Sequence, residues 1–153
     1  MIIDDKLMKY VVFQKRTVAE VRGKCNKLGY TEEYTDEIIA YLQENAYLND
    51  EKYVEKYIQN VMRLKPASIY EMKIGLLKKG VKDEIIERYM NTNYEELLDF
   101  EYESAKKTVL KKYKQVEDFE KVKNYLKSKG YSYDSIKEGI DNCNHLIDNS
   151  NRE

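Results

Sequence analysis

Apolar residues recur at helical spacing along almost the whole chain, and short polar breaks separate the periodic stretches. The clearest breaks fall between 48 and 90. Pro66 has no amide hydrogen to donate, so it interrupts a helix there. Ser68 and Glu71 have the spacing of a capping box that starts the next helix, and Gly80 can end that helix by adopting a positive φ. The pattern predicts three short helices in this stretch, each of which must bury its apolar face against its neighbours.

The same landmarks recur at a period of about 50 residues. Thr17 aligns with Ser68 as a helix cap, and Gly29 aligns with Gly80 and Gly130 as a helix end. This self-similarity predicts an all-α fold, an elongated curved array of three tandem three-helix repeats. The expected divisions of this continuous domain are 1–48, 49–92 and 93–149 for the repeats, followed by a frayed tail at 150–153.

Charge is segregated along the chain although it nearly cancels overall. There are 27 basic and 28 acidic residues, so net charge alone does not indicate a nucleic-acid binder. The middle helices of the expected repeats are basic and the third helices are acidic. We interpret this as a basic stripe that tracks a phosphate backbone or an acidic protein groove. The alternative is a set of solvated helix faces with local ion pairs, each worth less than about 1 kcal/mol. The candidate contact residues are Arg16, Arg22, Lys24, Lys65, Lys73, Lys78, Lys79, Lys106, Lys107, Lys111 and Lys112.

Catalytic and metal-binding patterns are not found in the sequence. His145 is the one histidine, and no partner residues are spaced for a catalytic or metal role. Cys25 and Cys143 do not form a Cys-x-x-Cys pair, so they do not predict a structural zinc site. We therefore expect a binding protein and not an enzyme, with no metal and no cofactor.

No stretch is long and apolar enough to suggest a membrane span, and the first residues do not resemble a secretory signal. Both cysteines sit at apolar-periodic positions, which favours buried free thiols over a disulfide. These observations favour a cytoplasmic protein with no membrane partner. Exposed tyrosines near basic residues, such as Tyr70 and Tyr113, can stack on nucleic-acid bases.

Four short stretches follow one another in a particular order. The first, Arg-Thr-Val-Ala-Glu-Val-Arg-Gly-Lys-Cys, is similar to an Arg-Ser-x-x-Glu-Leu-x-x-Lys-Leu signature. The others are similar to a Leu-x-Asp-Asp/Glu-x-Tyr/Phe pattern, a Leu-x-x-Lys-Gly-Ile element and a Leu-x-x-(Arg/Lys)-Gly-Phe element. Together they resemble the RecX family, the bacterial regulators of the RecA recombinase. The four stretches are 16–25, 47–57, 76–81 and 126–131.

The resemblance implies a protein that binds the RecA–DNA filament, in its groove or at its growing end. It implies restraint of filament growth, ATP hydrolysis, strand exchange and the co-protease activity that triggers the SOS response, and thus a role in DNA repair and recombination. The expected partner is the RecA filament, DNA is a further candidate partner, and the expected state is a monomer. Two alternatives remain open: a direct nucleic-acid-binding helical module, and a helical-repeat scaffold for another protein.

Overall fold

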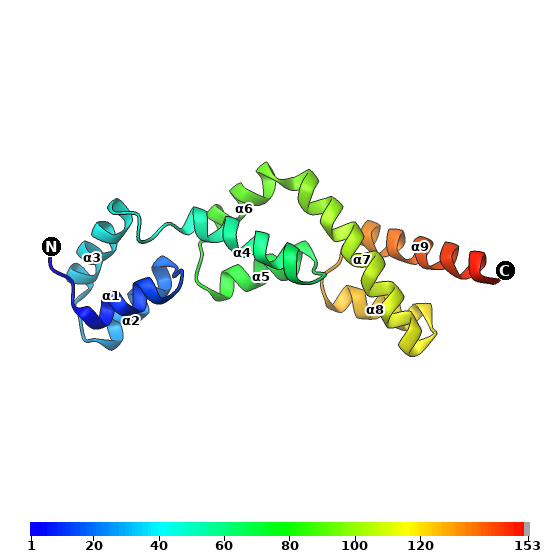
Figure 1. The fold of residues 1–153 in the computed structure, drawn as a ribbon, viewed down its shortest axis with the longest axis horizontal. Helices are drawn as coiled ribbons and strands as arrows, with labels where there is room; N and C mark the ends of the chain where they lie inside the picture. Colours follow the sequence, from blue (N-terminus) through cyan, green and yellow to red (C-terminus); the bar gives the residue numbers. More distant parts are fainter. Residues whose placement is uncertain (152–153) are drawn as a thin grey trace. The chain divides into compact units, whose positions relative to one another are not determined.

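The computed structural model describes residues 1–151, which contain nine α-helices and no strand (Figure 1). The helices are α1 (Asp5–Phe13), α2 (Val18–Lys27), α3 (Glu32–Glu44), α4 (Asp50–Leu64), α5 (Ile69–Lys78), α6 (Asp83–Thr92), α7 (Tyr94–Val116), α8 (Phe119–Ser128) and α9 (Tyr133–Asn151). The predicted all-α fold of tandem helical repeats is confirmed. The exact boundaries between repeats stay a prediction. At the C-terminal end, α9 continues into the expected frayed tail as far as Asn151, and 152–153 lie outside the described residues.

The chain divides into two compact units. Unit 1 comprises Met1–Tyr57 and Gly75–Tyr89, and unit 2 comprises Ile58–Ile74 and the chain from Met90 onward. The division does not follow the repeats, because each unit takes part of α4, α5 and α6. As a result, each unit contains one place where successive repeats meet.

The core of unit 1 is formed by the apolar faces of α1, α2 and α3. Residues spaced by four, such as Leu7 with Val11 and Val21 with Cys25, lie on one side of their helices and are 5% exposed or less. Leu48 closes this cluster beyond the end of α3. The buried members are Leu7, Val11, Val21, Cys25, Ile38, Ile39, Leu42 and Leu48.

The core of unit 2 is formed mainly by α7, α8 and α9. Gly139 lets α9 approach α7 closely, because a Cβ at this position would lie 2.8 Å from Val109 Cγ2 and 2.9 Å from the Ala105 carbonyl oxygen. The buried members of this cluster are Ala105, Val109, Val122, Leu126, Tyr131, Ile136, Ile140 and Cys143.

In unit 1, the start of α2 is hydrogen-bonded to the following repeat. The Thr17 hydroxyl accepts from the Glu20 amide at 3.1 Å and donates to the Lys79 carbonyl at 2.7 Å. Asp50 Oδ1, at the start of α4, accepts from the Val18 amide at 2.9 Å. We call this set of contacts the unit-1 junction. One hydroxyl thus caps its own helix and satisfies a carbonyl at the end of α5.

In unit 2 the same arrangement recurs one repeat later. The Ser68 hydroxyl accepts from the Glu71 amide at 3.0 Å and donates to the Lys129 carbonyl at 2.6 Å. Glu101 Oε1 accepts from the Ile69 amide at 3.0 Å, as Asp50 does for Val18 in unit 1. We call this set the unit-2 junction. The predicted capping box at 68–71 is confirmed, and its hydroxyl has a second role that spacing alone did not show.

The need to donate explains the choice of cap residue. A hydroxyl oxygen can accept one hydrogen bond and donate another through the same atom, whereas an ionised carboxylate accepts only. The third repeat starts its middle helix, α8, with Asp118, whose Oδ1 accepts from the amides of Glu120 and Lys121. Threonine and serine therefore occur at the caps that contact a following repeat, and aspartate occurs at the cap of the third repeat.

Candidate functional site

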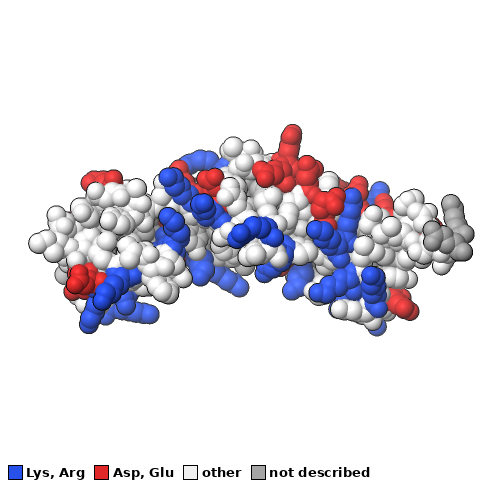
Figure 2. All heavy atoms as spheres, viewed as in Figure 1, with Lys and Arg blue, Asp and Glu red and all other residues white. Residues whose placement is uncertain are grey.

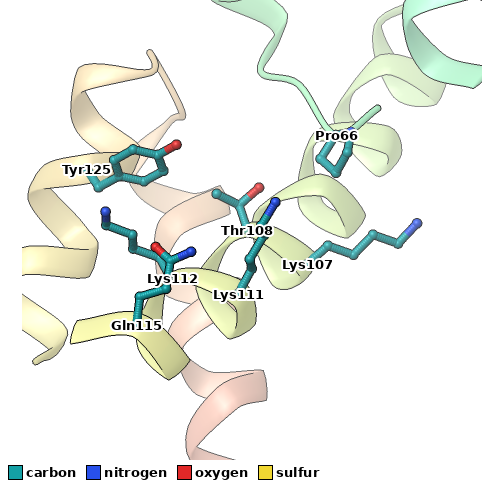
Figure 3. Close-up of a pocket in the computed structure, with 7 residues that line it drawn as sticks. All are labelled: Pro66, Lys107, Thr108, Lys111, Lys112, Gln115 and Tyr125. Carbon is teal, nitrogen blue, oxygen red and sulfur yellow. The ribbon is translucent and has the colours of Figure 1, made fainter. Parts of the chain in front are cut away.

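A basic surface pocket of about 370 Å³ lies on unit 2, beside the C-terminal half of α7 (Figure 3). Lys107 and Lys111 are one helical turn apart and therefore share a face of α7, with Lys112 next to them. Figure 3 shows Lys112 directed toward the ring of Tyr125 on α8. No carboxylate lines this pocket. Its lining residues are Pro66, Lys107, Thr108, Lys111, Lys112, Gln115 and Tyr125.

The ring of Tyr125 lies near one cation of this pocket, Lys112, and near Lys129, which is not among the lining residues. Lys112 Nζ lies 4.5 Å from the centre of the Tyr125 ring, and Lys129 Nζ lies 5.6 Å from it. Both distances are within the range of cation–π attraction, which holds the ammonium groups near the ring face. The ring concentrates positive charge at one place on the surface. Tyr125 was not predicted as a site residue, although it lies four positions before Lys129 at the end of α8.

Charge changes sign along α7. The first turns carry the exposed acids Glu95, Glu96 and Asp99, and the second half carries the lysines of the pocket. Figure 2 shows the red side chains over the start of α7 and the blue ones over its later part and α8. This order suits the helix dipole, which favours anions at the N-terminus and cations at the C-terminus. The pocket is therefore a locally positive site on a chain with almost no net charge.

The structure brings together only some of the sequence-predicted contact residues of unit 2. Lys107, Lys111 and Lys112 line the pocket together. Lys106 instead forms an ion pair with Glu103, with Nζ 3.1 Å from Oε1. Lys65 is exposed beside the pocket residue Pro66, whereas Lys73 is half-buried on α5.

Among the predicted contact residues of unit 1, two meet at the ring of Tyr10. The Arg16 guanidinium carbon lies 3.8 Å above the ring centre, and Arg16 Nε donates to the Tyr10 carbonyl at 2.9 Å. Lys24 Nζ lies 5.5 Å from the same ring. Tyr10 was not predicted as a site residue.

The other predicted cations of unit 1 lie apart from that ring. Arg22 pairs with Asp36 at 2.9 Å, an exposed ion pair that contributes less than about 1 kcal/mol. Lys78 and Lys79 are exposed at the end of α5. The predicted set thus includes one group in the unit-2 pocket, one group at Tyr10, and several cations outside both.

The described residues contain no group of three histidine, cysteine or acidic side chains that could hold a metal ion. Across residues 1–151, no helix has the length and apolar character needed to span a membrane. Cys25 and Cys143 are buried free thiols, and burial raises the pKa of both.

The fold and these surfaces define a helical-repeat protein with a basic, tyrosine-bearing pocket on unit 2 that is suited to binding. No family model matches the chain. A curated protein of Clostridium perfringens named Regulatory protein RecX is 34% identical over 138 residues, covering 86% of this chain and 60% of that protein. A Prosthecochloris aestuarii protein of the same name is 23% identical over 137 residues, covering 90% of each. These similarities support assignment of the chain to the RecX family.

Solved structures agree with this assignment. The crystal structure of RecX from Lactobacillus salivarius superposes with a TM-score of 0.80 at 29% identity, covering 90% of this chain and 91% of that one. A second crystal structure of a regulatory protein RecX superposes with a TM-score of 0.79 at 20% identity and supports the fold alone. The chain spans about 60% of the length of the clostridial relatives.

Proposed function

We propose that this protein regulates the RecA recombinase by binding the RecA–DNA filament. Binding would restrain filament growth, ATP hydrolysis, strand exchange and co-protease activity. In this proposal, the protein is a cytoplasmic monomer that acts by binding and not by catalysis. Similarity to RecX proteins supports the regulatory role. The observation that carries the mode of contact is the basic pocket on unit 2, whose exposed lysines suit an anionic filament surface.

The lysines of this pocket would steer and hold the filament by charge. Lys107 and Lys111 are exposed and pair with no carboxylate in the described part of the chain. Exposed charges at the edge of an interface mainly increase the rate of association, and salt weakens their attraction. Lys112, which is held against Tyr125, is already ordered, so less side-chain entropy is lost when it meets an anion.

The first test is the single-strand-dependent ATPase rate of the cognate RecA as this protein is titrated in. Inhibition well below equimolar amounts supports filament binding by blocking of growth. Inhibition only near saturation supports occupation along the filament. An unchanged rate at every ratio would overturn the assignment as a RecA regulator.

A matched pair of variants tests the contact surface. Lys107→Glu with Lys111→Glu reverses two charges in the pocket, and the expected result is at least a tenfold higher concentration for half-inhibition. Lys121→Glu with Lys137→Glu makes the same change at exposed positions of unit 2 outside this pocket and should leave inhibition within twofold of the parent. Equal effects of the two pairs would show that net charge, not this pocket, determines binding.

Direct binding to nucleic acid is the second candidate function, favoured by the aromatic ring of Tyr125 among lysines. It predicts binding to naked single-stranded DNA with a steep dependence on salt, in the absence of RecA. If Tyr125→Leu weakens DNA binding while the ATPase effect on RecA is unchanged, the two activities use different surfaces.

A further inference from the structure

A second basic pocket lies on unit 1, where the loop before α2 meets the first turns of α4. It encloses about 100 Å³ and is lined by four cations, Lys15, Arg16, Lys52 and Lys56, together with Tyr53. Lys15 and Arg16 come from the loop, and Lys52 and Lys56 lie one helical turn apart on α4. Residues from the first and second repeats thus converge on one small space.

Arg16 is fixed before any ligand arrives. Its Nε donates to the Tyr10 carbonyl at 2.9 Å, and its guanidinium stacks 3.8 Å above the Tyr10 ring. This leaves the planar end of the group to present further N–H donors to an anion. A cation held in this way loses little conformational freedom on binding, which favours recognition of a defined group over diffuse attraction.

Among the described residues, none of the four cations forms an ion pair with a carboxylate. Burial raises the pKa of Tyr53, and the nearby carboxylates of Glu20 and Asp50 raise it further. Each of these carboxylates also accepts a hydrogen bond from a backbone amide. Glu20 Oε1 accepts from the Thr17 amide at 3.0 Å, and Asp50 Oδ1 accepts from the Val18 amide at 2.9 Å. Four neighbouring positive charges repel one another, so a bound anion relieves an existing cost.

The size and charge of the pocket indicate the class of ligand that it can bind. The space of about 100 Å³ has room for a small oxyanion, and most of its charged lining comes from two elements only. Four cations around that volume suit a phosphate group, whose several oxygens carry more negative charge than one carboxylate. The guanidinium fork of Arg16 also matches phosphate geometry.

The repeat provides separate support. Lys56 and Lys107 hold equivalent places in the first helices of successive repeats, and Lys15 and Pro66 hold equivalent places in the loops before the capped helices. Each unit therefore builds a lysine-bearing pocket from the same two elements. We propose that the unit-1 pocket is a phosphate-binding site, for a phosphodiester of nucleic acid or for a free phosphate compound. This site does not depend on an interaction with RecA.

The test uses the full chain without RecA and follows the Arg16 Nε–H resonance in nitrogen–proton NMR spectra. Titration with inorganic pyrophosphate at constant ionic strength should give a saturable shift of this resonance. The variant Lys52→Gln with Lys56→Gln should raise the apparent Kd at least tenfold. The matched variant Lys6→Gln with Lys9→Gln removes two exposed charges on α1 and should change the Kd less than twofold. A thermal unfolding curve for each variant shows that the fold is retained.

Three ligands then identify the source of the phosphate. A single-stranded oligonucleotide that shifts Arg16 at lower concentration than pyrophosphate assigns the site to a nucleic-acid backbone. Pyrophosphate that binds more tightly than the oligonucleotide assigns it to a free phosphate compound. A glutamate-rich peptide that saturates the shift while both phosphate ligands leave it unchanged would overturn the proposal in favour of an acidic protein partner. Equal Kd values for the two variants would overturn it as well.

Discussion

The carboxylate of Glu101 is the centre of the unit-2 junction, and its removal should destabilise the protein more than any surface change on α7. Glu101 is 2% exposed. Its Oε1 accepts from the Ile69 amide at 3.0 Å, and its Oε2 accepts from the hydroxyls of Ser132 and Ser135. Glu101→Ala leaves the helix-initiating amide of Ile69, which is partly buried, without its acceptor.

The size of the effect follows from which donors lose their only acceptor. A hydrogen bond to a charged group contributes about 1.5–3 kcal/mol, and an orphaned buried donor costs about 1–3 kcal/mol. The hydroxyls of Ser132 and Ser135 keep each other as partners at 2.8 Å, so their loss is partial. Removing the carboxylate also removes its own desolvation cost. We expect a net loss of about 3 kcal/mol, or roughly 6–12 °C in Tm for a chain of this size.

The matched control is Glu103→Ala, two residues along the same helix. Glu103 is exposed and pairs only with Lys106 at 3.1 Å, so its loss should cost less than about 0.5 kcal/mol. The assay is equilibrium unfolding in urea followed by circular dichroism, with the midpoint compared at constant slope. If Glu101→Ala costs less than about 1 kcal/mol, or no more than Glu103→Ala, the junction does not stabilise the fold as described here.

Three further outcomes are expected. Gly29 and Gly80 both have a positive φ. A Cβ at Gly80 would lie 2.3 Å from the Cβ of Ala19 in the neighbouring repeat, whereas a Cβ at Gly29 would meet open space. Gly80→Ala should therefore lower the urea midpoint clearly more than Gly29→Ala. Burial raises the pKa of Asp50, so the folded state holds its proton more tightly than the unfolded state. The stability of the parent relative to Asp50→Asn should thus be highest below the unfolded pKa and fall as pH rises through the folded one, which urea titrations at a series of pH values will measure. Burial also raises the thiol pKa of Cys25 and Cys143, so both should react slowly with a disulfide reagent at pH 8 and rapidly in denaturant, and fast native labelling would contradict their burial.

Local patterns made much of the fold predictable. The caps at Thr17 and Ser68, each followed by an acid three residues later, mark helix starts through contacts within one turn, and the structure has capping boxes at both. Gly29, Gly80 and Gly130 mark helix ends because all three adopt a positive φ. These signals depend on neighbouring residues only, so a sequence shows them directly.

The parts that the sequence did not reveal depend on contacts between distant segments. The Thr17 hydroxyl and the Lys79 carbonyl are 62 residues apart, and no local pattern predicts their hydrogen bond. Lys52 and Lys56 lie in or beside a stretch with many acids, so a running charge count hid their convergence with Lys15. A stripe of basic helices was a reasonable hypothesis, but grouping of its members needed the folded chain.

The hydroxyl of Thr17 also bears on how the protein unfolds. It ties the first turn of α2 to the last carbonyls of α5, so fraying at either place removes a partner from the other. Ser68 does the same for α5 and α8, and α5 therefore takes part in both ties. These hydrogen bonds join successive repeats, so the unfolding of one repeat leaves a backbone carbonyl or a hydroxyl of the next repeat without its partner. Unfolding should therefore be cooperative between neighbouring repeats. Amide protons near the two ends of α5 should accordingly exchange with solvent at similar rates.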